Sequence, residues 1–275
     1  MQDLSSSFGF LKHVKTLPQT CTHHPQQHMQ QLEPGSPFCP ICQRERVKEH
    51  NLQIERDYYA KRSKYLTSDV LARDSILDDE SVTGCTFANY VVEAGSEAEI
   101  NKNLARHMAG HYLDPDYQVD TILTGTPGTG KTHLAMAMVH AVNDNIKPPT
   151  SCLFVSVSKL TMSIKAGFKY KDPQLTVESA TKLLTSAGLL VLDDLGSESS
   201  MRSAGGEASE WTQQLLFSVI NGRKGRIIVT TNLNSQQLAQ TYNEKLRSRL
   251  YRGYKKANSI IKFTDKTVDY RGEQL

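Results

Sequence analysis

The stretch GTPGTGKT at Gly125–Thr132 constrains the fold of this chain more than any other feature of its sequence. It has the pattern GxxxxGK[ST], and it stands between the short apolar segment TILTG and a segment with helical periodicity, as a phosphate-binding loop requires. Glycines let backbone amides close around phosphates, and the positive end of the helix dipole adds to the attraction. We therefore predict that a nucleotide is bound by Gly125, Thr126, Pro127, Gly128, Thr129, Gly130, Lys131 and Thr132.

Four short apolar segments, each followed by a helical pattern, predict the architecture around this loop. They read TILTG, SCLFVSV, GLLVLDD and RIIVTTN, in chain order. Strands that alternate with helices form a parallel sheet covered by helices on both faces. We therefore expect an α/β fold, with one large domain over residues 84–275.

Polar side chains follow two of these segments and complete the expected nucleotide site. Asp193 and Asp194 end the third segment, and Asn232 ends the fourth. Ligands of open α/β sheets bind at the carboxyl ends of the strands, so these side chains should approach the phosphate loop. We expect Lys131 to reach the β and γ phosphates of ATP, and Thr132 and Asp193 to hold Mg²⁺. Asp194 would orient or deprotonate the attacking water, with Asn232 near the γ phosphate.

The first 43 residues contain a possible metal site. The segment CTHH and the later CPIC supply Cys21, His24, Cys39 and Cys42, in the spacing of a tetrahedral structural zinc site. His23 and His28 compete for the imidazole position, and a His-rich tail with two unrelated cysteines is the alternative. We predict a zinc-binding module over residues 1–43, whose folding depends on the metal.

A helical segment is predicted between the zinc module and the α/β domain, over residues 44–83. No Gly or Pro occurs from Ile41 to Thr83, and Val47, Ile54, Tyr58 and Tyr65 recur at helical spacing. We expect a long helix that packs on something along only part of its surface, either another protein or its own domain.

Motif order gives the chain a resemblance to a known family. A Walker A motif at Gly125–Thr132, a Walker B motif at Leu189–Asp194, the VTTN segment and EKLRSRL follow one another as in AAA+ ATPases. The segment CTFANYVVE, at Cys85–Glu93, makes the chain similar to the DnaC and DnaI type of bacterial and phage helicase loaders. The resemblance implies an AAA+ P-loop ATPase fold preceded by the small zinc-binding module and long helix.

The family resemblance also assigns two arginines. Arg249 matches an arginine finger that acts on the ATP of a neighbouring subunit, with Arg247 as the alternative, and Arg271 resembles a sensor 2 arginine that binds nucleotide. A finger acting between subunits implies self-assembly into a ring or spiral. Many AAA+ enzymes carry Glu where this chain has the shorter Asp194, so we hypothesise slow, assembly-dependent hydrolysis.

What the resemblance implies about function is an ATP-dependent loader in DNA replication. Such a protein binds the replicative hexameric DNA helicase through its leader and delivers it onto single-stranded DNA. Candidate DNA contacts lie in SIKAGFKYKD and in the loop after Walker B, since basic and aromatic side chains alternate in the first. These contacts are Lys165, Phe168, Lys169, Ser197 and Ser199, and a solvated helix end is the alternative for the first three.

Other functions remain to be weighed. An IstB-like transposition helper shares the ATPase core and acts on duplex DNA with a transposase, but such helpers generally lack a Cys and His leader. A zinc adaptor with a purely structural nucleotide site is disfavoured by the intact Lys131, Asp193 and Arg249.

Composition narrows the cellular setting. The net charge of +3 is too small to indicate nucleic-acid binding by itself. The sequence shows neither a signal peptide nor an apolar run long enough to span a bilayer, so we expect a cytoplasmic protein that does not contact a membrane.

Overall fold

The computed structural model describes residues 14–170, 176–200, 208–252 and 259–267. Contacts divide the chain into two compact units, an N-terminal unit of residues 1–63 and an ATPase unit of residues 64–275. In the described ranges, none of the helices combines the length and the apolar character that are needed to cross a membrane.

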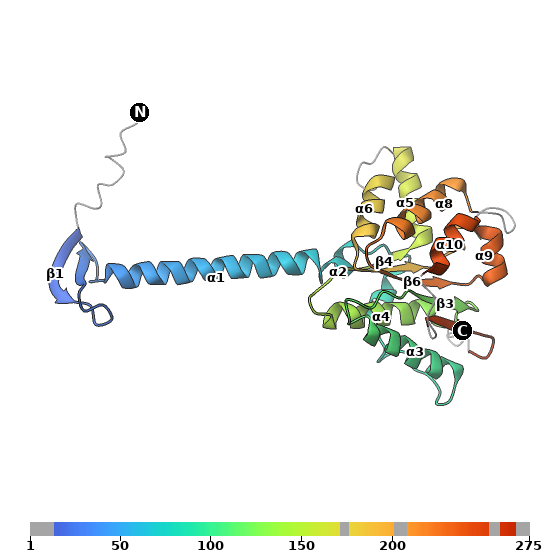
Figure 1. Cartoon of the computed structure of the whole chain (residues 1–275), viewed down its shortest axis with the longest axis horizontal. Helices are drawn as coiled ribbons and strands as arrows, with labels where there is room; N and C mark the ends of the chain where they lie inside the picture. The colour runs from blue at the N-terminus through green and yellow to red at the C-terminus, as the bar shows by residue number, and fades with distance from the viewer. Residues whose placement is uncertain (1–13, 171–175, 201–207, 253–258, 268–275) are drawn as a thin grey trace. The chain divides into compact units, whose positions relative to one another are not determined.

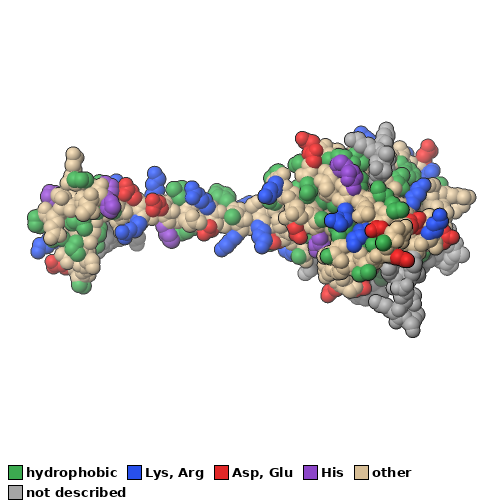
Figure 2. Space-filling view, turned by 90° about the horizontal axis from the view of Figure 1, so that it is seen from below, with side chains coloured by type: hydrophobic (Ala, Val, Ile, Leu, Met, Phe, Trp, Pro, Cys, Tyr) green, Lys and Arg blue, Asp and Glu red, His purple; other side chains and the backbone are tan. Residues whose placement is uncertain are grey.

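The N-terminal unit consists of a hairpin and a long helix. Strands β1 (Val14–Thr20) and β2 (His28–Leu32) pair antiparallel, with Val14 opposite Leu32. Helix α1 (Pro40–Leu66) follows, and none of its residues is buried. Figure 2 shows hydrophobic side chains interspersed with both signs of charge along this helix. The hairpin was not predicted, because its strands have no alternation of apolar and polar residues.

The helix predicted over residues 44–83 ends earlier than expected. It ends at Leu66, and the chain continues as α2 (Val70–Asp74) and a 3₁₀ helix, η2 (Glu80–Gly84). The intervening Thr, Ser and Asp compete with helical hydrogen bonds. Val70 and Leu71 are then buried in the ATPase unit, and the Ile76 amide donates to the Phe154 carbonyl over 2.9 Å. Tertiary burial and strand pairing therefore stop the helix that local propensity would continue.

The ATPase unit is built on a parallel sheet of five strands in the order β4-β5-β6-β3-β7. The four predicted strands are confirmed, and a fifth, unpredicted strand pairs with β3. Their bounds are β3 Thr121–Gly125, β4 Cys152–Ser156, β5 Leu189–Asp193, β6 Arg226–Thr231 and β7 Ile260–Phe263. Because β6 lies between β5 and β3, the carboxyl ends of these three strands meet at one edge.

Helices cover both faces of this sheet, as predicted (Figure 1). On one face, α3 (Glu97–His111) and α4 (Lys131–Asn145) bury a cluster that includes Met108 and Leu134. On the other face a second cluster includes Leu160, Leu184 and Leu216. It is formed by α5 (Val157–Tyr170), α6 (Val177–Ser186), α8 (Glu210–Gly222) and α10 (Glu244–Arg252). The short helices α7 (Ser197–Ser200) and α9 (Ser235–Thr241) follow β5 and β6, respectively.

Candidate functional site

The phosphate loop runs from the end of β3 to the start of α4, as predicted. Gly125 has a φ of 135°, and a Cβ there would lie 1.8 Å from the Phe263 carbonyl oxygen of β7. Gly130 has a φ of 86°, and a Cβ there would lie 2.5 Å from the ring of Tyr90. These two glycines are therefore required both by backbone conformation and by close approach of their neighbours.

Tyr90 supports this loop from outside the motif. Its buried side chain donates a hydrogen bond to the Thr129 carbonyl over 3.0 Å. Its ring centroid lies 5.0 Å from that of His133 in α4. Tyr90 lies in the segment Cys85–Glu93, which is similar to helicase loaders, but the sequence alone indicated no role for this residue.

Lys131 is buried at the centre of the loop. Its ammonium group donates to the carbonyls of Gly125 and Thr126, over 2.9 and 2.5 Å. These bonds hold the cation over the loop whose amides would receive phosphate. Contact between Lys131 and the terminal phosphates of ATP stays a prediction.

Asp193 lies at the neighbouring strand end, and its carboxyl group is buried. The Thr230 hydroxyl donates to it over 2.6 Å, and the Thr132 hydroxyl also bonds it. Burial raises the pKa of Asp193 to about 6, although both hydroxyls favour the charged form. The structure thus brings Thr132 and Asp193 together, with the hard oxygen ligands that Mg²⁺ prefers.

Asp194 and Asn232 form a second polar pair at this edge of the sheet. The Asn232 side-chain amide donates to the Asp194 carboxylate over 2.9 Å. Asp194 has a φ of 55°, in the left-handed region, and its amide donates to the Thr230 hydroxyl over 2.8 Å. Thr230 therefore contacts both aspartates, a role that sequence reasoning missed although VTTN was identified as a motif.

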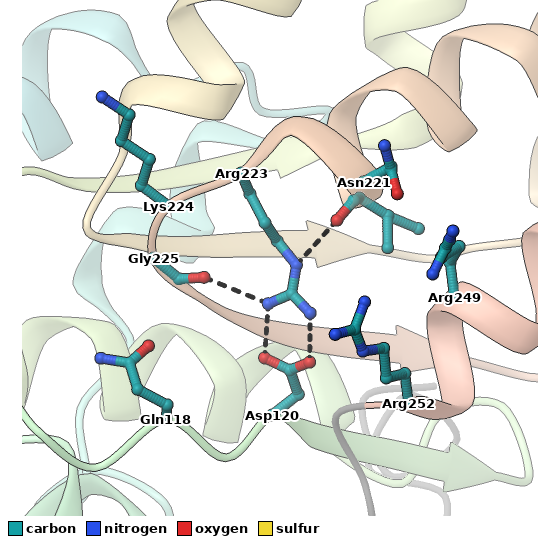
Figure 3. A pocket seen from close by; sticks show the side chains of 9 residues that line it. Gln118, Asp120, Asn221, Arg223, Lys224, Gly225, Arg249 and Arg252 are labelled. Carbon is teal, nitrogen blue, oxygen red and sulfur yellow. Dashed lines mark hydrogen bonds and ion pairs between the residues drawn. The ribbon is translucent and has the colours of Figure 1, made fainter.

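Arg249 lies at the opposite edge of the sheet. It belongs to α10 and lines a pocket with Asp120 and Gly225, which immediately precede β3 and β6 (Figure 3). A strand of five residues spans roughly 16 Å, so Arg249 is remote from the phosphate loop of its own chain. Arg247 is not among the residues that line this pocket. Arg271 lies outside the described residues.

The predicted DNA contacts are dispersed. Lys165 is exposed on α5, with its ammonium 5.6 Å from the ring centroid of Trp211. Ser197 donates to the Asp194 carbonyl over 2.8 Å. Ser199 is buried and donates to the Gly196 carbonyl over 2.7 Å, so its hydroxyl is already engaged within the fold. The side chains of Phe168 and Lys169 lie outside the described residues.

The four predicted zinc ligands converge in the N-terminal unit. The ligand atoms of Cys21, His24, Cys39 and Cys42 all lie within 4.8 Å of one another. His24 Nδ1 is 3.3 Å from the Cys42 sulfur, which is 3.5 Å from the Cys21 sulfur. These separations are close to the edges of a tetrahedron around Zn²⁺ with bonds of about 2.0 to 2.3 Å.

Two further features of this cluster are compatible with a bound metal ion. His24 Nε2 lies 3.4 Å from a carboxylate oxygen of Glu45 in α1, an arrangement that orients metal-bound histidines. Burial disfavours the Cys21 thiolate, but hydrogen bonds from the His23 and His24 region outweigh it and lower its pKa to about 6. Neither His23 nor His28 belongs to the cluster.

The chain is similar to a protein family, to individual curated proteins and to solved structures. The sequence model of the IstB-like ATP binding proteins matches residues 88–250. The replicative helicase loader DnaC of Buchnera aphidicola subsp. Schizaphis graminum is 31% identical over 133 residues, which make up 48% of this chain and 50% of that protein. The replicative helicase loader DnaC of Escherichia coli (strain K12) is 26% identical over 174 residues, 62% of this chain and 64% of that protein.

Among solved structures, the replication initiator DnaA bound to AMPPCP and single-stranded DNA aligns with 67% of this chain and 51% of its own. The TM-score is 0.50 at 20% sequence identity, which supports the shared fold alone. The curated relatives confirm the resemblance to DnaC-type loaders, and the chain spans half to two thirds of their length.

Proposed function

Because the chain belongs to the family of IstB-like ATP binding proteins, we propose that its ATP site drives assembly on a replicative hexameric helicase and delivery of that helicase onto single-stranded DNA. One observation carries this proposal: a complete ATP site and a separate Cys and His module occur in one chain that resembles DnaC loaders. A ligand shifts a protein toward the arrangement that it binds more tightly, so ATP would favour the assembled state.

In this proposal, each residue at the carboxyl edge of the sheet has a distinct task. Lys131 and the loop amides bind the triphosphate, and Thr132 and Asp193 hold Mg²⁺. Asn232 fixes the Asp194 carboxylate through their 2.9 Å hydrogen bond, so that Asp194 can orient the attacking water. The Asp194 side chain reaches less far than a Glu side chain, so we expect slow hydrolysis of ATP. A fast hydrolysis rate without DNA or a partner would contradict this expectation.

Arg249 would act in the next subunit rather than in its own. Its position at the amino ends of β3 and β6 supports this role, because its own phosphate loop lies at the other end of β3. A ring or spiral of copies would bring each Arg249 to a neighbouring triphosphate. Hydrolysis would then depend on assembly.

The N-terminal unit would bind the helicase. Cys21, His24, Cys39 and Cys42 would hold a structural zinc ion, since four ligands leave no open position for catalysis. Helix α1 presents Val47, Ile54 and Tyr58 to solvent, each more than half exposed. An apolar stripe on an exposed helix favours contact with a groove of a partner protein.

A second candidate function is favoured by the family match itself. A transposition helper with this ATPase core would act on duplex DNA with a transposase, and the matched family is named for IstB. The Cys and His cluster favours the helicase loader, and the partner that binds the N-terminal unit distinguishes the two functions.

A loading assay tests the proposal. The host's replicative helicase is supplied with a forked DNA whose single strand is coated with single-strand binding protein, and unwinding is measured with and without the full chain and ATP. We expect unwinding to require the chain and to be lost with Lys131→Ala. Lys182→Ala, an exposed residue of α6, serves as the matched control. Unwinding that is independent of the chain would overturn the proposal.

A further inference from the structure

A pocket at the amino edge of the sheet holds more positive charge than its ion pairs neutralise. It has a volume of about 310 Å³ and is bounded by the end of α8, the residues before β3 and β6, and α10. Figure 3 shows the Arg252 side chain extending from α10 toward Arg223 and Asp120, the Arg249 side chain on the side of Asn221, and Lys224 pointing away from both.

The single carboxylate of this pocket is already engaged. Asp120 accepts hydrogen bonds from both terminal nitrogens of Arg223, over 2.6 and 2.5 Å, and a third from the Ile227 amide over 2.9 Å. Arg223 also donates to the Ile220 carbonyl, which fixes its guanidinium group. Within the described ranges, neither Arg249 nor Arg252 forms an ion pair.

Two guanidinium groups one helical turn apart suit a phosphate ligand. Residues three apart on a helix are neighbours, and planar guanidinium groups bind phosphate oxygens with two parallel hydrogen bonds. The phosphate loop of the same chain lies at the other end of β3, roughly 16 Å away, and cannot supply that phosphate. The ligand must therefore come from another molecule.

We propose that this pocket receives the triphosphate of ATP held by the phosphate loop of a second copy, and that Arg252 contacts it together with Arg249. The proposal rests on the assembly described under the proposed function and extends it by a second arginine. The Asp120–Arg223 pair acts as a positioning element: it occupies the carboxylate that would otherwise neutralise the two ligand-binding cations. A compact pair of arginines favours one terminal phosphate group over an extended nucleic-acid backbone, which needs a row of cations.

The rate of ATP hydrolysis by the full chain tests this arrangement. The chain is assembled with the host's replicative helicase, single-stranded DNA, ATP and Mg²⁺. Arg252→Ala should lower hydrolysis roughly ten- to a hundredfold, the effect of losing a charge-assisted hydrogen bond. Its affinity for ATP as an isolated chain should stay unchanged. Lys182→Ala removes an exposed charge elsewhere and should hydrolyse ATP at the wild-type rate.

The decisive measurement mixes Arg252→Ala with Lys131→Ala. The first variant retains a phosphate loop and the second retains the pocket, so a mixed assembly contains interfaces with both. Hydrolysis above the sum of the two separate rates supports the proposal. Absence of recovery shows that Arg252 acts within its own chain and overturns it.

Two further outcomes separate this inference from the proposed function. If the wild type assembles and hydrolyses ATP while Arg252→Ala is unaffected, only the inference fails. If the wild type neither assembles nor hydrolyses ATP, both fail. Weaker binding of a labelled single strand by Arg252→Ala, with hydrolysis unchanged, would assign the pocket to DNA and overturn the inference.

Discussion

The ATPase unit and the N-terminal unit of this chain differ in how many of their side chains are buried. The ATPase unit buries apolar side chains on both faces of a five-stranded sheet, and many of them are fully inaccessible. In residues 14–63, by contrast, only Cys21 and Cys39 are buried. A domain without an apolar core needs another source of free energy to offset the entropy of ordering its chain. We therefore propose that metal binding stabilises the N-terminal unit, whereas the hydrophobic effect stabilises the ATPase unit.

Removing the proposed metal ion is the strongest test of this comparison. We expect a chelator, or Cys42→Ser, to unfold the hairpin, because zinc contributes on the order of 10 kcal/mol to such modules. Hydrogen exchange of residues 14–39, followed by mass spectrometry, measures the loss of protection. The melting of the ATPase unit, followed by the fluorescence of Trp211, should not change, since this is the single tryptophan of the chain.

A serine at another cysteine provides the control. Cys85 lies in the ATPase unit outside the cluster, so Cys85→Ser should leave the hairpin protected. A hairpin that stays protected without metal would show that the N-terminal unit has a source of stability other than its cysteines and histidine.

Shortening a buried side chain in the core of the ATPase unit should have the next largest effect on stability. Ile228 of β6 is fully buried between the helices and the neighbouring strands, so Ile228→Ala leaves a cavity. We expect the free energy of unfolding of this unit to fall by about 2 to 5 kcal/mol. Urea denaturation followed by Trp211 fluorescence measures it, and a change below about 0.5 kcal/mol would contradict the described packing.

A smaller effect is expected where α3 contacts the chain after β7. Glu97 accepts hydrogen bonds from the amide and hydroxyl of Thr264, each over 2.9 Å, and from the Thr267 hydroxyl. Partial burial raises the pKa of Glu97, but these bonds outweigh it, and the net pKa is lowered. Glu97→Gln should therefore cost less than about 1 kcal/mol at neutral pH, since solvent screens the site.

The pH dependence of the destabilisation by Glu97→Gln tests whether these hydrogen bonds lower the pKa of Glu97. A lowered carboxyl pKa stabilises the folded state above the unfolded pKa, and that stability is lost as pH falls through the folded value. The difference between Glu97→Gln and the wild type should therefore begin to shrink as the pH falls below the unfolded pKa of about 4.3, and it should vanish below the lowered folded pKa. A difference that grows on acidification would contradict these hydrogen bonds.

The smallest effect on stability is expected on α1, at a residue of the same type as Ile228. Ile54 is 52% exposed, so Ile54→Ala should change the unfolding free energy by less than about 0.5 kcal/mol. Its affinity for the helicase should fall roughly tenfold or more if this stripe is the contact surface. Calorimetric titration with the helicase measures the affinity, and an unchanged value would remove Ile54 from the proposed interface.

The same difference between the units explains what the sequence could predict. The core strands were predicted because continuous apolar runs and the phosphate loop specify them locally. The hairpin and β7 were missed, since β7 has only four residues and its pairing with β3 depends on tertiary structure. Tyr90, Thr230 and Glu45 were missed for a related reason: each acts through a contact with a residue distant in sequence.

The central claim is that the chain is a helicase loader, and native mass spectrometry of the full chain tests it most directly. The chain is measured alone, and then with ATP, a short single strand and either the host's replicative helicase or a transposase. The account predicts one zinc ion per chain and an ATP-dependent complex of several chains with a helicase hexamer. A chain that leaves the helicase unbound and associates with the transposase would contradict it.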